Sequence, residues 1–172
     1  MALPPDLPHA SLSIVVFRVV QKGRDPLGTT GSLQAGGRFN PPNAFGALYT
    51  SLEAATALKE VAKGLRLRGI DPEEFPEDAY WIYELEVRLK AVLDLTDPDV
   101  LQKSRLQQNS LIGTDLNATR EIAAEARERG YEALLVPSAA DPNAKNLVMF
   151  PDRLVEPPRV LSSMLVRLTR ET

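Results

Sequence analysis

The fold of this chain can be inferred from residues 36–60, GGRFNPPNAFGALYTSLEAATALKE. They begin as a loop rich in glycine and proline, pass through a short apolar strand at 47–49 and enter a helical pattern over residues 52–67. Thr50, followed three residues later by Glu53, has the form of a capping box and predicts where that helix begins. A strand that leads directly into a helix is typical of a mixed α+β domain. The helix is expected to bury one apolar stripe: Leu58, Val61, Ala62 and Leu65.

Further strands are predicted on both sides of this stretch. Residues 80–88 alternate between apolar and polar side chains, and 91–95 either continue this strand or pair close by. The alternation places one set of apolar side chains on a single face: Trp81, Tyr83, Leu85 and Val87. Four other segments are apolar enough to be strands: 14–20, 132–136, 147–150 and 160–168.

Two further helices are indicated by their end signals. Asp97 before Pro98 predicts a helix that runs to about residue 103, and Gly130 ends a helix predicted over 117–129. No internal repeat and no linker divides the chain, so we expect a single α+β domain.

The composition excludes most catalytic chemistries. The 172 residues include no cysteine and one histidine, His9, which lies in a proline-rich leader at residues 1–12. Thiolate nucleophiles, Ser-His-Asp hydrolases and metals held by histidine or thiolate therefore lack their essential parts. We expect no metal, and any catalysis must use carboxylates, hydroxyls, arginine, lysine or tyrosine.

Net charge and hydropathy limit the cellular location and the classes of binding partner that we expect. A net charge of −3 offers no broad basic field, so direct binding of nucleic acid is not expected. No apolar run is long enough to span a bilayer, and the amino terminus has no signal-peptide pattern. The sequence therefore predicts a cytoplasmic protein without a membrane partner.

The loop at residues 23–46 is longer than most structural connections and is a candidate functional loop. Gly36 and Gly37 allow the backbone to approach a ligand closely, and Arg38 can offer a planar fork to a phosphate or carboxylate. The alternative is an ordinary glycine turn with a solvated arginine. Arg18 is also unusual, because it interrupts a β-branched strand where a charge must pair, reach the surface or face a polar cleft.

Tyr49, Glu60 and Ser138 each allow two interpretations. Tyr49 either packs back on Ala54 at the start of the helix or offers a ring on which a flat ligand stacks. Glu60 lies opposite the apolar stripe, where the simplest interpretation is a solvated glutamate paired with Lys63. Its small neighbours also allow that face to form the wall of a cleft. Ser138 follows a strand and a proline and is either a turn residue or a hydrogen-bonding group of a site.

Taken in order, the motifs of the chain resemble the RES-domain family, which is named for an arginine, a glutamate and a serine. Arg38 and Tyr49 are eleven residues apart, as are Tyr49 and Glu60, in agreement with the family pattern. Ser138 would be the serine of the trio, and the resemblance covers residues 14–155. It rests on six motifs: Phe17-Arg18, the segment 36–41, the segments 48–51 and 55–61, Pro137-Ser138 and the segment 146–150.

This resemblance implies that residues 13–172 form a RES domain with a fold similar to ADP-ribosyltransferases, in which split and bent β-sheets with flanking helices enclose a cleft for NAD. It also implies a toxin that degrades NAD by phosphorolysis or hydrolysis of the nicotinamide–ribose bond. The partner would be a helix-turn-helix antitoxin of the Xre type that blocks the cleft. NAD would be the substrate and inorganic phosphate a co-substrate, with no prosthetic group.

The resemblance assigns roles that fit the restricted chemistry of the chain. Glu60 would stabilise positive charge on the ribose, as carboxylates do in glycosidases. Arg38, with Arg18, would hold the pyrophosphate or the attacking phosphate, Tyr49 would stack on nicotinamide, and Ser138 would bond to the ribose or the carboxamide. Two alternatives remain, an ADP-ribosyltransferase with a protein acceptor and an inactive RES-fold binding module. If residues 160–168 form an exposed edge, two chains can pair there as a homodimer.

Overall fold

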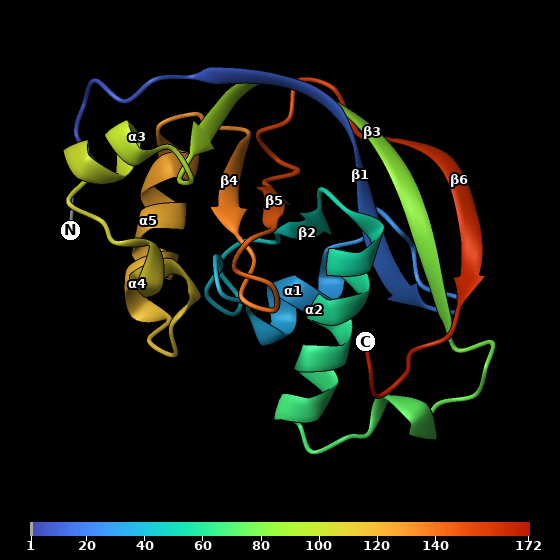
Figure 1. Cartoon of the computed structure of the whole chain (residues 1–172). Helices are drawn as coiled ribbons and strands as arrows, with labels where there is room; N and C mark the ends of the chain where they lie inside the picture. Colours follow the sequence, from blue (N-terminus) through green and yellow to red (C-terminus); the bar gives the residue numbers. More distant parts are fainter. Residues whose placement is uncertain (1) are drawn as a thin grey trace.

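The computed structural model describes residues 2–172 and confirms a single α+β domain. Figure 1 shows two long, bent strands over the top and one side of the molecule, with shorter strands and helices beneath them. The strands are β1 (Ala10–Gln21), β2 (Leu48–Ser51), β3 (Tyr80–Asp94), β4 (Ala133–Pro137), β5 (Lys145–Met149) and β6 (Arg159–Val166). The helices are α1 (Thr30–Ala35), α2 (Ala54–Leu67), α3 (Pro98–Lys103), α4 (Gln108–Ile112) and α5 (Asn117–Glu128), with a 3₁₀ turn at Pro72–Glu74.

Five of the strands close into a barrel. They are paired in the order β1-β2-β5-β4-β3, and β3 returns to pair with β1 along almost its whole length. The pairing of β3 with β4 is parallel, and the other pairings are antiparallel. Strand β6 joins the other edge of β3 and, within residues 2–172, has no second neighbour in the sheet. This closed and bent β-structure is the architecture that the resemblance implied.

One edge of β3 is split between two partners. Residues 80–86 of β3 pair with β6, whereas residues 92–94 pair with β4. The gap between them is filled by the carboxylate of Glu132, which is only 2% exposed. Its Oε2 accepts hydrogen bonds from the backbone N–H groups of Lys90 (2.6 Å) and Ala91 (2.9 Å), and its Oε1 accepts one from Val155 (2.9 Å). One buried side chain thus replaces the missing strand at the split.

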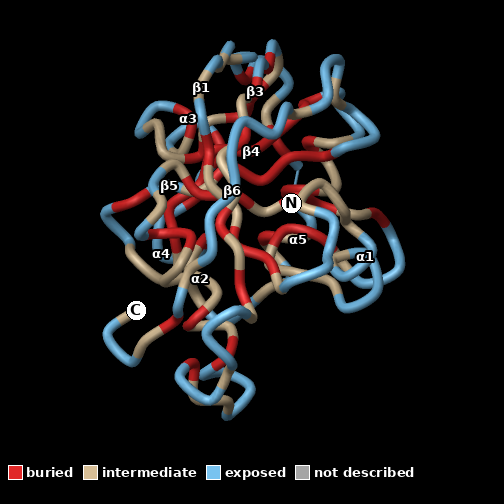
Figure 2. The backbone as a smooth tube through the Cα atoms, turned by 90° about the vertical axis from the view of Figure 1, so that its right-hand side faces the viewer, coloured by how far each residue is buried: buried red, intermediate tan, exposed pale blue. Residues whose placement is uncertain are grey.

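Three of the helices lie together on one side of the barrel. Helices α3, α4 and α5 lie on the side of the molecule away from β6 (Figure 1), and their apolar residues join a core cluster that contains Phe45 and Phe150. Leu3 and Leu7 of the proline-rich leader are buried in the same cluster, and β1 begins within that leader at Ala10. Figure 2 looks onto β6, which is exposed along its length. Among the described residues, no helix combines the length and apolar character needed to cross a bilayer.

The predicted start of the central helix is wrong. Helix α2 begins at Ala54 with Glu53 as its N-cap residue, and no side chain bonds to the free N–H groups there. The hydroxyl of Thr50 instead donates to the carbonyl of Leu147 (2.8 Å), because Thr50 is still part of β2. A capping-box spacing cannot distinguish a capping threonine from one that belongs to the strand before the helix.

The apolar face expected along β3 is formed by three of its four residues: Tyr83, Leu85 and Val87 pack in one cluster in the barrel interior, and Trp81 is half-buried. Tyr80 and Ile82 on the opposite face are buried as well, in a cluster that contains α2 residues, because α2 covers the start of this strand. The sequence did not indicate this second buried face. The short helices α1 and α4 and the 3₁₀ turn were not predicted from the sequence.

Candidate active site

Four of the five residues expected at the site line one cleft of about 500 Å³: Arg18, Arg38, Tyr49 and Glu60. The cleft lies where β1 and β2 meet the loop at 36–38 and one face of α2. Its size is within the range of small-molecule sites in proteins. Thr56 and Ala57 on α2 are buried, and Gly64 has no atom within 4 Å of where its Cβ would lie, which leaves open space beside Glu60.

Glu60 projects from the middle of α2 and is held from one side. Its Oε1 accepts hydrogen bonds from the hydroxyl of Ser138 (2.5 Å) and the amide nitrogen of Asn146 (2.6 Å), and a longer one from the N–H of Ala140 (3.4 Å). Among the described residues, Oε2 accepts no hydrogen bond, and it is not among the buried polar atoms that lack a partner. The second carboxylate oxygen is therefore accessible from the cleft.

The interpretation of Glu60 as a solvated glutamate paired with Lys63 is therefore wrong. Lys63 donates instead to the carbonyl of Ala139, and Lys59 forms an ion pair with Asp141 (2.7 Å). Three α2 residues, one of them Glu60, thus bind the loop that follows β4. Glu60 does lie on the side of α2 opposite the apolar stripe, but the sequence could not show that a loop distant along the chain covers this side of the helix.

Ser138 lies behind Glu60 and is fully buried. Its hydroxyl donates to Glu60 and accepts hydrogen bonds from the backbone N–H groups of Ala140 (3.1 Å) and Asp141 (3.0 Å). Ser138 does not line the cleft. In this structure it therefore combines both interpretations, since it shapes the turn at 138–141 and orients the Glu60 carboxylate.

Tyr49 lines the same cleft from β2. Its hydroxyl donates to Asn40 Oδ1 (2.7 Å) and accepts from the N–H of Phe39 (2.9 Å). Burial raises the pKa of Tyr49 to about 12, so the phenol stays neutral and serves as a fixed bridge to the loop. The ring packs on the core cluster that contains Phe39, and Ala54 packs against a different cluster.

The two glycines allow this bridge. Gly36 has φ +70°, and a Cβ on it would lie 2.8 Å from Cδ of Pro42. A Cβ on Gly37 would overlap the Tyr49 hydroxyl and lie 2.7 Å from Cζ of the same ring. Side chains at either position would push the loop away from the cleft.

Arg38 is held at the rim of the cleft and is not a solvated arginine. Its Nη1 donates to the carbonyl of Gly113 (2.5 Å) and, more weakly, to that of Leu111 (3.4 Å). Burial lowers the pKa of Arg38, and the negative charge of Glu60 raises it in part. The guanidinium remains charged at neutral pH, and its Nε and Nη2 have no hydrogen-bond partner among the described residues.

Arg18 has a different environment. Its Nη1 donates to the carbonyl of Pro26 (2.6 Å) and its Nη2 to that of Gly28 (3.0 Å), so it binds the loop that follows β1. Burial lowers its pKa to about 10, and the charge of Asp25 opposes this shift. Arg18 lies between the cleft and a smaller hollow of about 260 Å³.

Two site residues were missed by the sequence interpretation: Asn146 and Ser51 both line the cleft. They lie directly opposite one another in the pairing of β2 with β5, and Ser51 donates to Asn146 Oδ1 (2.7 Å). The available signal was a polar residue at the start of an apolar strand, but its importance depends on a strand register that the sequence does not give. Within residues 2–172, no group of three or more histidine or carboxylate side chains is arranged to hold a metal ion.

Comparison with known proteins places this chain in a family. A family model for the RES domain matches residues 15–169. The NAD(+) phosphorylase MbcT of Mycobacterium tuberculosis and of Mycobacterium bovis is 30% identical over 123 residues, which are 72% of this chain and 66% of that protein. A probable NAD(+) phosphorylase of M. tuberculosis, Rv3189, is 31% identical over 125 residues, 72% of this chain and 58% of its own length.

The match to these relatives thus spans less than two thirds of their own length. A chain in the crystal structure of the M. tuberculosis MbcT–MbcA toxin–antitoxin complex superposes with a TM-score of 0.81 and 27% identity, covering 94% of this chain and 87% of that one. The family match extends over nearly the whole domain, and both the barrel and the ordered motifs agree with it. The chain belongs to the RES domain family.

Proposed function

We propose that this protein is a toxin that degrades NAD by cleaving the bond between nicotinamide and ribose. The observation that carries the proposal is the Glu60 carboxylate, which is fixed through one oxygen and presents the other to a cleft that Arg38 and Tyr49 also line. The names of the relatives as NAD(+) phosphorylases support the same reaction.

The chemistry fits this set of groups. When the C1′–N bond breaks, its electron pair leaves with nicotinamide, which departs as a neutral molecule and needs no acid. Positive charge then develops on the ribose ring, and the nearby carboxylate of Glu60 stabilises it. An oxygen of inorganic phosphate forms the new bond to C1′, which gives ADP-ribose 1″-phosphate.

The other residues bind and orient the reactants. Arg38 has unused N–H donors that suit the pyrophosphate or the attacking phosphate, and Tyr49 offers a ring for nicotinamide. Arg18 is already bonded to two carbonyls, so its contribution is to hold the wall of the cleft beside the phosphates. Ser138 acts through Glu60, with direct contact to the ribose as the alternative.

The same cleft is where we expect a regulatory partner to bind. A structural neighbour is a chain of a toxin–antitoxin complex, which supports a cognate antitoxin for this protein. We propose a helix-turn-helix protein of the Xre type that covers the cleft and excludes NAD.

We also propose that two copies pair through β6. This eight-residue edge strand is exposed from Arg159 to Leu165. An antiparallel pair centred on Ser163 would place Leu161 opposite Leu165 and Val160 opposite Val166 of the second copy. Such self-complementary pairing is the usual form of a twofold interface.

The deciding experiment incubates purified protein with NAD, with and without phosphate, and separates nicotinamide from the ADP-ribose products. Release of nicotinamide that depends on phosphate, together with ADP-ribose 1″-phosphate, is the expected result. Release without phosphate would indicate hydrolysis, and label on an added protein would indicate an ADP-ribosyltransferase. No release under any condition would leave an inactive binding module.

A further inference from the structure

The Glu60 carboxylate is held by a relay of side chains that runs along the cleft from β2 through β5 to α2. Ser51 on β2 donates to Asn146 Oδ1 (2.7 Å), and Asn146 Nδ2 on β5 donates to Glu60 Oε1 (2.6 Å). Since its oxygen is occupied by Ser51, the amide of Asn146 is oriented with its nitrogen towards Glu60. From this geometry we infer that Asn146 is a positioning residue, which directs the free charge of Glu60 to Oε2 for the proposed reaction; the inference rests on that proposed function.

The strand register makes this arrangement rigid. Asn146 lies opposite Ser51 on β2 and opposite Val136 on β4, so β5 is bonded on both sides at this point. The backbone of Asn146 forms the ladder, and its side chain is left to reach Glu60. Replacing only the side chain therefore leaves the ladder intact and removes the contact.

All described donors to Glu60 approach the same oxygen. Asn146, Ser138 and the N–H of Ala140 all meet Oε1, whereas Oε2 has no hydrogen-bond partner among the described residues. Such one-sided donation fixes the side chain and leaves one oxygen to meet a ribose hydroxyl or developing positive charge. Of the two N–H donors to Oε1, Asn146 makes the shorter contact (2.6 Å against 3.4 Å for Ala140). Asn146 lies in a strand, whereas Ala140 lies in a loop.

An amide suits this position, whereas a carboxylate does not. The change Asn146→Asp would place a second negative group about as close to Oε1 as the amide is now, and the two groups would then share a proton. Several charged or titratable groups surround the pair, and all are unchanged by the substitution. They are Arg18 on β1, Arg38 in the glycine loop, Tyr49 on β2, Lys59 and Lys63 on α2, and Asp141 in the loop after β4.

The experiment measures nicotinamide release by wild type, Asn146→Ala and Asn146→Asp as a function of NAD concentration and pH. For Asn146→Ala we expect kcat to fall by roughly 10-fold to 100-fold with KM for NAD changed by less than about threefold. For Asn146→Asp we expect the acid limb of the kcat profile to move by roughly one pH unit or more to higher pH. Asn117→Asp, at the exposed start of α5, is the matched control and should behave as wild type.

A merely structural role would lower kcat by the same factor at every pH and would lower stability, so an unshifted profile for Asn146→Asp overturns the inference. A rise in KM at unchanged kcat also overturns it, because Asn146 would then bind NAD directly. If the wild type releases no nicotinamide, the proposed function fails, and the positioning is judged from a crystal structure of Asn146→Ala. A Glu60 side chain that keeps its place in that structure overturns the inference, and a displaced one supports it.

Discussion

Gly37 and Tyr49 are so close that a single added carbon on Gly37 would lie 2.7 Å from Cζ of the Tyr49 ring. The ring in turn bonds through its hydroxyl to Phe39 and Asn40, which follow Gly37 in the same loop. The loop that carries Arg38 is thus fitted against one aromatic side chain, and the shape of the cleft depends on that contact.

Gly37→Ala should therefore lower kcat/KM for NAD by roughly 10-fold or more, because the ring and the loop must separate and Arg38 moves with them. The matched control is Gly130→Ala after α5, away from the cleft, where no atom lies within 4 Å of the new Cβ. It should keep its activity and lose about 1–2 kcal/mol of stability, because its φ of +86° disfavours a side chain. Wild-type kinetics for Gly37→Ala would show that the contact does not shape the site.

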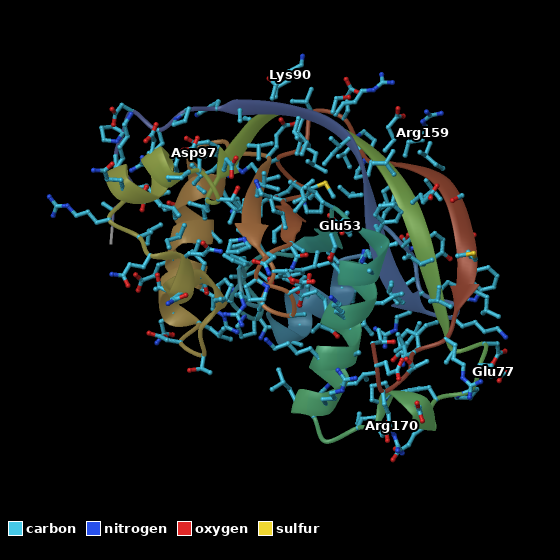
Figure 3. All side chains as sticks on the ribbon, in the orientation of Figure 1. Glu53, Glu77, Lys90, Asp97, Arg159 and Arg170 are labelled. Atoms are coloured by element: carbon cyan, nitrogen blue, oxygen red, sulfur yellow. The ribbon has the colours of Figure 1, made fainter. Side chains whose placement is uncertain are left out.

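Glu60→Gln should reduce kcat by roughly 10²-fold or more, equivalent to about 3 kcal/mol, with a folded protein and a similar KM. The control is Glu53→Gln, since Glu53 lies exposed at the start of the same helix (Figure 3) and makes no side-chain capping bond. Steady-state nicotinamide release measures both variants. Equal turnover of Glu60→Gln and wild type would remove Glu60 from the reaction.

The raised pKa of Tyr49 gives a pH dependence of stability with a defined sign. Folding favours the neutral phenol, so this contribution is complete below about pH 10 and is lost as the pH rises towards 12. Between these values the wild type should lose at most about 3 kcal/mol relative to Tyr49→Phe, which cannot ionise. Urea unfolding from pH 8 to 11.5 measures this difference.

Tyr83→Phe is the control for that experiment, because the Tyr83 hydroxyl has no hydrogen-bond partner among residues 2–172. Its stability should follow the wild type across the whole pH range. A difference between wild type and Tyr49→Phe that stays constant up to pH 11.5 would contradict the expected neutral phenol.

Glu132→Gln should destabilise the fold by about 2–4 kcal/mol, because three backbone N–H groups meet this carboxylate and an amide nitrogen would face at least one of them. The side chain of Lys90 points outward (Figure 3), so only the backbone of that residue depends on Glu132. Glu128→Gln at the exposed end of α5 should change stability by less than about 0.5 kcal/mol. Equal unfolding midpoints for both variants would show that the split sheet does not need the carboxylate.

Leu161→Lys should convert a β6-paired homodimer into a monomer, because it places two charges in the proposed self-pairing strand. In Figure 3 the side chain of Arg159 lies at the outer edge of the sheet, at the start of this strand. Leu67→Lys is the control, since Leu67 is 79% exposed on α2, away from β6. Analytical ultracentrifugation decides the matter, and a wild type that sediments as a monomer at high concentration would refute the pairing.

Local patterns predicted the elements better than they predicted the contacts between them. Asp97 before Pro98 gave the start of α3 because the capping interaction is local, and Asp97 does accept from the N–H of Asp99. Thr50 misled because its partner, Leu147, is 97 residues away. The second buried face of β3 was missed for the same reason, since α2, which covers it, lies outside the local pattern of that strand.

For the site, too, the sequence predicted the residues better than it predicted the contacts between them. Arg38, Tyr49 and Glu60 were identified through the spacing of family motifs, and the structure brings them to one cleft. The helix wheel alone favoured a solvated Glu60, because the groups that bind it lie 78 and 86 residues further along the chain. Asn146 and Ser51 were not identified because only the register of β2 with β5 makes them neighbours.

These long separations have a consequence for synthesis on the ribosome. Glu60 is translated well before Ser138 and Asn146, and β2 lacks its second neighbour until β5 has emerged. A nascent chain that ends before Ser138 carries the carboxylate but none of the side chains that orient it. The cleft can therefore be completed only after β5 has left the ribosome, when the 86 residues that follow Glu60 up to Asn146 have all been made.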